Sequence, residues 1–209
     1  MTEHLHTMAA RGEIVAYFGY GSLVNPATHR TATVHCERAH LRGYRRAWQE
    51  RPDEAEHPIA LLTAAPEPDE AIELSGLIVF DRAENLPAVD EREAGYDRLA
   101  LAPDRLRLDR PDAALPDMPI YVYRARAPAR PETVHHILQS YLDAVLQGYL
   151  HQFGPEGARA FVRHTARFDT PVLRDRDEPL YPRAVRLSGD ERGFIDALTA
   201  DLRLVDGFV

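Results

Sequence analysis

The order of its strand-like and helical segments is the feature that most limits the fold of this chain. Apolar or alternating stretches typical of strands occupy much of the first 125 residues, and helical patterns dominate the rest. The expected strands span residues 14–20, 33–41, 44–50, 57–64, 71–82, 98–108 and 119–125, and the expected helices span residues 83–95, 131–151, 155–166 and 190–204. Because strands and helices hardly alternate, this order predicts an α+β fold with a mostly antiparallel or mixed sheet, not a doubly wound one.

Length and charge narrow the class of protein. The chain has 209 residues with no repeat and no low-complexity linker, so we expect a single domain, 1–209, with a real core. The net charge of −8 argues against nucleic acid or an anionic membrane surface as a partner. The N-terminus lacks the apolar region of a signal peptide, and no window approaches the ~18 apolar residues of a membrane span. We therefore expect a cytoplasmic protein that binds no membrane.

Two features of the composition exclude particular chemistries. Lysine is absent from the chain, which excludes a Schiff-base lysine, a pyridoxal phosphate attachment, a P-loop lysine and a lysine nucleophile. Cys36 is the only cysteine, so the chain has neither an internal disulfide framework nor a cysteine-based metal site. The histidines show no His-Glu-x-x-His spacing, and we predict no metal site.

Glycines interrupt two of the expected strands. Gly76 lies inside the strand 71–82 and predicts a bulge or the close approach of another backbone. The stretch "AYFGYGSLVNPATHR", residues 16–30, passes from an apolar strand through a Gly-Tyr-Gly-Ser turn to Asn25 and Pro26. Asn as the N-cap with Pro at the first helical position predicts that a helix starts there.

The Gly-Tyr-Gly-Ser turn, residues 19–22, has several interpretations. A dinucleotide-binding fingerprint would need a third glycine where this chain has Val24, followed by repeated βαβ units. A hydrolase elbow at Ser22 would need a glycine two residues to either side, whereas here a glycine immediately precedes the serine. A third interpretation is anion binding, in which unpaired backbone N–H groups and the Ser22 hydroxyl hold a carboxylate or phosphate. A plain tight turn that needs positive φ fits the spacing equally well.

An acidic segment, "NLPAVDEREAGYDR", holds four acids in residues 85–98. On a helix, the spacing of Leu86, Val89, Glu93 and Tyr96 places them on one face, which begins apolar. Glu93 is therefore the acid expected on the buried stripe near the helix end. Burial and the negative end of the helix dipole both favour its protonated form, which suits an acid and base near neutral pH. An ordinary surface ion pair with a neighbouring arginine is the alternative.

Together these stretches resemble the gamma-glutamylcyclotransferase-like superfamily, particularly its bacterial and ChaC-type members. The Tyr-Gly-Ser-Leu tetrapeptide of that superfamily stands at residues 20–23, and its Leu-Asp-x-Arg-Glu-x-Gly-Tyr element appears as "VDEREAGY" at residues 89–96. The segment "GYRRAWQE", residues 43–50, is similar to its Gly-Tyr-x-Arg segment, and "SGLIVF", residues 75–80, to its glycine-containing strand. The resemblance covers about residues 14–150, and 151–209 would be a helical extension.

The resemblance implies a small mixed or antiparallel β-barrel flanked by helices, with a small γ-glutamyl compound as substrate. It implies that Glu93, the residue chosen independently by the helical spacing, is the catalytic acid and base. The reaction would release 5-oxoproline without metal or cofactor, because the substrate's own α-amine attacks its γ-carbonyl. The expected substrate-binding residues are Tyr20, Gly21, Ser22, Leu23, Arg46 and Tyr96.

A non-catalytic binding or interaction module of the same fold is the alternative function. The acid at position 93 favours the enzyme. Neither the leaving group (glutathione-derived, another amino acid or an amine) nor the oligomeric state follows from the sequence.

Overall fold

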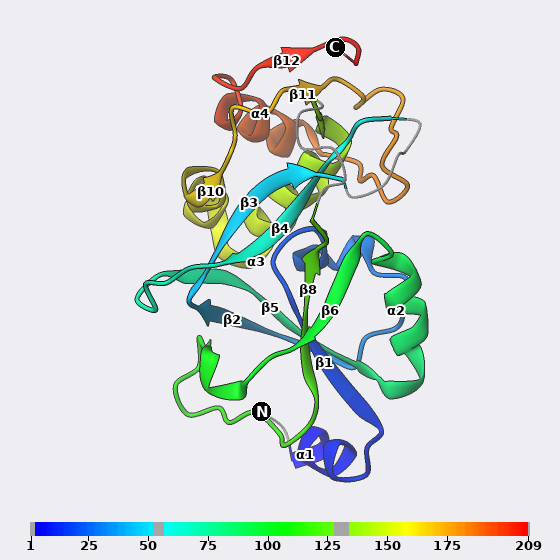
Figure 1. The fold of residues 1–209 in the computed structure, drawn as a ribbon, viewed down its shortest axis with the longest axis vertical. Coiled ribbons are helices and arrows are strands. Elements are labelled where there is room, and N and C mark those ends of the chain that lie inside the picture. Colours follow the sequence, from blue (N-terminus) through cyan, green and yellow to red (C-terminus); the bar gives the residue numbers. More distant parts are fainter. Residues whose placement is uncertain (1–2, 52–56, 128–133, 209) are drawn as a thin grey trace. The chain divides into compact units, whose positions relative to one another are not determined.

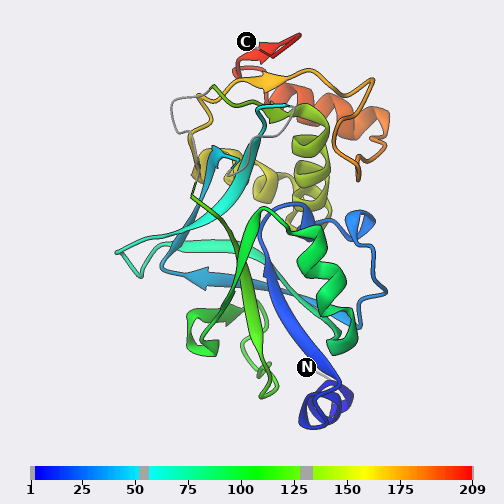
Figure 2. The same cartoon turned by 45° about the vertical axis from the view of Figure 1, so that its right-hand side comes forward.

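The computed structural model describes residues 3–51, 57–127 and 134–208, and Figures 1 and 2 show it from two sides. The chain divides into two compact units, each built from separate stretches of sequence. The first unit comprises Met1–Tyr20, His29–Arg45 and Ala64–Arg124, and the second comprises Gly21–Thr28, Arg46–Thr63 and Ala125–Val209.

A six-stranded mixed sheet organises the first unit. Its strand order is β6-β8-β1-β5-β2-β7. The strands are β1 (Ile14–Gly19), β2 (His35–Arg42), β5 (Glu73–Arg82), β6 (Tyr96–Ala100), β7 (Leu106–Leu108) and β8 (Ile120–Ala125). Strand β1 pairs antiparallel with β5 and parallel with β8, and β2 pairs antiparallel with β5 and with β7. The predicted α+β class with a mixed sheet is confirmed.

Strand β1 lies in the core of this unit. All six of its residues are buried, and successive side chains point to opposite faces of a sheet, so both faces of β1 are covered. Phe18 on β1 and Phe80 on β5 are among the largest fully buried side chains. At Gly76, the carbonyl oxygen of Gly19 would lie only 2.3 Å from an added Cβ. The predicted close approach of another backbone is confirmed.

Short helices precede or connect the strands of the first unit. They are α1 (Glu3–Ala10), η3 (Ala83–Asn85), α2 (Leu86–Arg92) and η4 (Pro103–Arg105). Figures 1 and 2 both show α2 beside the sheet. The helix predicted over 83–95 is present, but Tyr96 does not extend its face, because the chain turns and Tyr96 starts β6. The strand predicted over 98–108 is interrupted by η4, where Pro103 has no N–H to donate.

The second unit consists of helices and short strands. Its helices are η1 (Ser22–Val24), η2 (Pro26–Thr28), α3 (Gln139–His164) and α4 (Gly189–Leu198). Its sheets have the orders β10-β3-β4 and β12-β11-β9. The strands are β3 (Tyr44–Glu50) and β4 (Ala60–Pro66), of which residues 46–50 and 60–63 belong to this unit, together with β9 (Ile137–Leu138), β10 (Thr165–Ala166), β11 (Val172–Leu173) and β12 (Leu204–Val205). No helix in the described ranges is long and apolar enough to cross a membrane.

The helices predicted for this unit are present with different bounds. Gly154 has a positive φ of 71° and kinks α3 just before Pro155, which separates the two predicted helices. Residues 131–133 of the first predicted helix lie outside the described residues, and the helix begins only at Gln139. The last predicted helix ends at Leu198, because Leu204 joins the short strand β12.

The prediction that an α-helix starts at Asn25 and Pro26 is wrong. The residues after Asn25 form a single 3₁₀ turn. The Asn25 side chain accepts a bond from the N–H of Ala27, and its amide donates to the carbonyl of Ala144 and to Gln147 on α3, each at 2.9 Å. These contacts with α3 fix the chain in a short turn that local sequence signals did not reveal.

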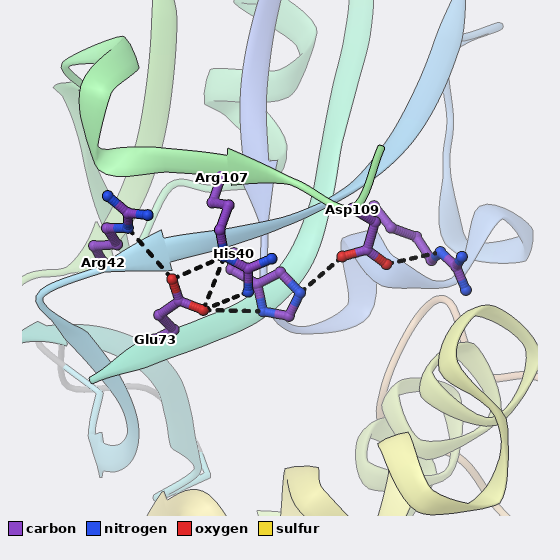
Figure 3. A network of polar contacts seen from close by, with 6 residues as sticks. His40, Arg42, Glu73, Arg107 and Asp109 are labelled. Carbon is purple, nitrogen blue, oxygen red and sulfur yellow. Dashed lines mark hydrogen bonds and ion pairs between the residues drawn. The ribbon is translucent and has the colours of Figure 1, made fainter. Parts of the chain in front are cut away.

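A charged network covers the β7 edge of the sheet (Figure 3). The Glu73 carboxylate accepts from Arg107 at 3.0 Å and from Arg42 at 3.3 Å. His40 stands between two carboxylates, with Nε2 2.8 Å from Asp109 and Nδ1 3.9 Å from Glu73. Hydrogen bonds from Arg107, which outweigh partial burial, lower the pKa of Glu73 to about 2.

This pKa predicts a pH-dependent contribution to stability. A carboxylate with a folded-state pKa below its usual value stabilises the fold above the usual pKa of 4.5 and loses this effect as pH falls through about 2. We expect Glu73→Gln to cost about 1 kcal/mol of unfolding free energy at pH 6, as for a partly exposed network. That cost should vanish between pH 4.5 and pH 2, as measured by urea denaturation. If Glu73→Gln still cost the same unfolding free energy at pH 2, the lowered pKa of Glu73 would be contradicted.

The matched control is Glu70→Gln. Glu70 lies 2.8 Å from Arg105, but its side chain is 70% exposed. We expect this substitution to change the unfolding free energy little at either pH, because exposed ion pairs contribute little.

Candidate active site

In the first unit, Tyr123 contacts both of the sequence stretches that carry the resemblance described above. The Tyr20 hydroxyl, at the end of β1, donates to the carbonyl oxygen of Tyr123 on β8 at 2.6 Å. The Tyr123 hydroxyl in turn donates to Asp90 on α2 at 2.8 Å. Strands β1 and β8 are neighbours in the sheet, and Tyr123 thus connects Tyr20 to the helix that precedes Glu93.

Tyr123 is suited to this linking role. Burial, followed by the hydrogen bond to Asp90 and the charge of that carboxylate, raises the pKa of Tyr123 above its usual value. The phenol therefore stays protonated and donates throughout the physiological range. The second oxygen of Asp90 lies 2.6 Å from Arg98, whose guanidinium stacks over the ring of Tyr121 at 4.8 Å. Tyr121 and Tyr123 share one face of β8, as their alternation predicts.

Glu93 is the C-cap residue of α2. Its side chain is 13% exposed, and Oε1 lies 2.9 Å from Nε of Arg92, which is only 5% exposed. The ion pair foreseen as an alternative is therefore present, but it is largely enclosed and not on the helix surface. Glu91, two residues earlier, is exposed. A carboxylate that is held in place and still reachable can accept and return a proton.

Tyr96 follows Glu93 after a tight turn. Its N–H donates to the carbonyl oxygen of Glu93 at 2.8 Å, and its side chain is half-buried at the start of β6. The first unit thus contains Tyr20, Glu93 and Tyr96 of the predicted site.

The other predicted site residues belong to the second unit. Gly21 precedes the 3₁₀ turn η1, and an added Cβ would meet the Tyr141 hydroxyl at 2.7 Å and Leu62 at 3.2 Å. Ser22 is buried, and its carbonyl oxygen accepts from the Thr28 hydroxyl and from the N–H of Asn25. The loop is thus a short turn against α3, not the first turn of an α-helix, and close packing explains the glycine.

Arg46 is enclosed within the second unit. The residue is 2% exposed, and its guanidinium donates to the Tyr149 hydroxyl at 2.7 Å and to Thr165 at 3.2 Å. It also stacks over the rings of Tyr149 and Phe161, and burial lowers its pKa. These contacts fix the guanidinium in an aromatic surrounding; its role toward a substrate stays a prediction.

Asp90 and Tyr123 are not among the site residues predicted from the sequence. No spacing signal links them, because their contact depends on how α2 returns to the sheet. Within the described ranges, no group of three or more His, Cys, Asp or Glu side chains is arranged to hold a metal ion.

Solved structures resemble this chain at low sequence identity. A structure described as a gamma-glutamyl cyclotransferase matches 88% of this chain and 99% of its own, with a TM-score of 0.51 and 14% identity. The chain has the gamma-glutamylcyclotransferase-like fold. YkqA from Bacillus subtilis matches 76% of this chain with a TM-score of 0.52 and 18% identity, and the match spans 56% of YkqA. No family model and no curated protein matches the sequence.

The mixed α+β fold expected from the resemblance is therefore confirmed. Identities of 14% and 18% establish a shared fold and leave activity to be argued from the residues themselves.

Proposed function

We propose that this protein is a cyclotransferase that releases 5-oxoproline from a γ-glutamyl compound, with Glu93 as acid and base. The observation that carries this proposal is the hydrogen-bonded link from Tyr20 through Tyr123 to Asp90. It connects the Tyr-Gly-Ser-Leu stretch to the helix that ends at Glu93. Shared fold alone supports only the general class.

In the proposed reaction, the substrate supplies its own nucleophile. Glu93 takes a proton from the α-ammonium, and the freed amine attacks the γ-carbonyl carbon of the same glutamyl group. A new C–N bond closes the five-membered ring, and the bond to the leaving amine breaks as Glu93 returns its proton to that nitrogen. The second proton of the ring nitrogen also passes to the leaving amine, which departs as an ammonium and leaves the lactam neutral. Holding amine and carbonyl together provides much of the rate acceleration, because the reaction is intramolecular.

The proposed binding residues act on the polar ends of the glutamyl group. Backbone N–H groups of Gly21, Ser22 and Leu23, with the Ser22 hydroxyl, would hold the α-carboxylate. Tyr20, Tyr96 and Arg46 are further proposed contacts. This chemistry requires neither a redox step nor an external nucleophile, so a small γ-glutamyl molecule is the one reactant.

The test is 5-oxoproline release by the purified protein from a panel of γ-glutamyl compounds. The panel includes glutathione, γ-glutamyl amino acids and γ-glutamyl amines, and the product is quantified by chromatography. We expect release from at least one class, and the preferred leaving group identifies the substrate. Absence of release from every class, by protein shown to be folded, would refute the proposed function.

A further inference from the structure

Beneath α2, a fully buried carboxylate accepts several hydrogen bonds. Asp81, near the end of β5, is 1% exposed. One oxygen accepts from the Tyr17 hydroxyl at 3.0 Å and from the Thr31 hydroxyl at 2.6 Å. The other accepts from the Asn85 amide at 2.7 Å and from the N–H of Arg82 at 2.8 Å. Burying a carboxylate is costly unless it is hydrogen-bonded, and four donors compensate that cost here.

One of these donors belongs to the residue that begins α2. Asn85 occupies the N-cap position, where an asparagine side chain usually bonds to the first turn of its own helix. Its side chain makes no such capping bond. It donates to Asp81 instead, so the start of α2 is tied to the end of β5.

Tyr17 holds the same carboxylate from the core strand β1. Burial, and then the Asp81 carboxylate, raises the pKa of the Tyr17 phenol above its usual value. The phenol therefore remains a proton donor to Asp81 at every physiological pH. The positive charge of Arg92 favours the opposite change and lowers the pKa of this phenol. Arg92 also contacts Glu93.

Helix α2 needs such ties to have a fixed position. It spans only seven residues, Leu86–Arg92, and isolated helices of that length are not stable in water. Of its apolar side chains, only Val89 is buried. The bond from Asn85 to Asp81 anchors its start, and the bond from Tyr123 to Asp90 anchors its second half.

We infer that Asp81 is a positioning residue: through Asn85 it fixes the start of α2 and thereby the place of Glu93. The inference rests on the proposed function, since it assumes that Glu93 is the acid and base that Asp81 helps to position. Asp81 itself is enclosed by protein groups and does not touch the substrate. This role differs from general stabilisation of the core. Asn85, one donor to Asp81, stands at the start of α2, whereas Thr31, another donor, lies outside that helix.

This difference provides a matched pair of variants. Asn85→Ala removes the donor that ties α2 to Asp81. Thr31→Val removes a donor to the same carboxylate from a residue outside α2, with almost no change in volume. Both variants leave Asp81 with one donor fewer, and we expect melting temperatures to fall by similar amounts.

The kinetic experiment compares kcat and KM for 5-oxoproline release. We expect Asn85→Ala to lower kcat about 10-fold or more with KM nearly unchanged, because small misplacement of a catalytic group is costly. Thr31→Val should keep kcat within about 3-fold of the wild type, a change too small to indicate a displaced group. Equal losses of kcat in both variants, or no loss in either, would overturn the inference.

A second readout does not depend on activity. Amide hydrogen exchange over residues 86–93 should become about 10-fold faster in Asn85→Ala and stay near the wild-type rate in Thr31→Val. If the wild type releases no 5-oxoproline, the proposed function fails, and the exchange data still show whether Asp81 positions α2. Faster exchange in Asn85→Ala with an unchanged kcat would overturn the catalytic importance of that positioning.

Discussion

Replacing Glu93 by Gln is expected to lower kcat for 5-oxoproline release by about 10²- to 10⁴-fold, the range for losing a general acid and base. Gln has nearly the same size as Glu, so the packing at the end of α2 should persist. The amide cannot take the proton of the substrate's α-ammonium, so the attacking amine stays protonated. KM should change much less than kcat, because the lost interaction acts in the chemical step. Steady-state kinetics on the preferred substrate measures both.

The control for this substitution lies two residues away. Glu91→Gln removes the same charge from the same helix, but Glu91 is exposed. We expect its kcat to match that of the wild type within about 2-fold, since a surface substitution leaves the structure nearly unchanged. Circular dichroism checks that both variants are folded. A folded Glu93→Gln variant with full activity would exclude Glu93 as the acid and base.

Local patterns predicted the elements whose form depends on their own residues. The continuous apolar run before Gly19 predicts a strand buried on both faces, and β1 is buried throughout. The spacing from Leu86 to Glu93 predicts a short helix with Glu93 near its end, and Glu93 caps α2. These features follow from hydrophobic periodicity alone.

Contacts between distant segments account for what sequence reasoning missed. Asn25 and Pro26 have the local signature of a helix start, but Asn25 donates its amide to Ala144 and Gln147, far along the chain. The Asn25 amide thus bonds to partners that the local capping rule does not predict.

The residues of the candidate site stay predictions, and the contacts that connect them could not be derived from the sequence. The motif residues Tyr20 and Asp90 are visible in the sequence, yet their common partner Tyr123 depends on the parallel pairing of β1 with β8. Asp81 gave no signal, because a single acid at the end of an apolar strand reads as an ordinary surface residue. Its burial and its donors exist only once β1, β5 and α2 are assembled.

Gly76→Ala is expected to lower the unfolding free energy by about 3 kcal/mol or more, at the upper end of the range for overpacking a core. The added Cβ would lie 2.3 Å from the carbonyl oxygen of Gly19 and 2.7 Å from the ring of Phe18. A ring can shift, but the oxygen belongs to β1, so the β1–β5 pairing itself must move. Gly193→Ala is the control, because an added Cβ in α4 meets nothing within 4 Å. It should gain up to about 1 kcal/mol from helix propensity. Urea denaturation measures both, and a Gly76→Ala variant within about 1 kcal/mol of the wild type would show that β1 and β5 separate more easily than this packing implies.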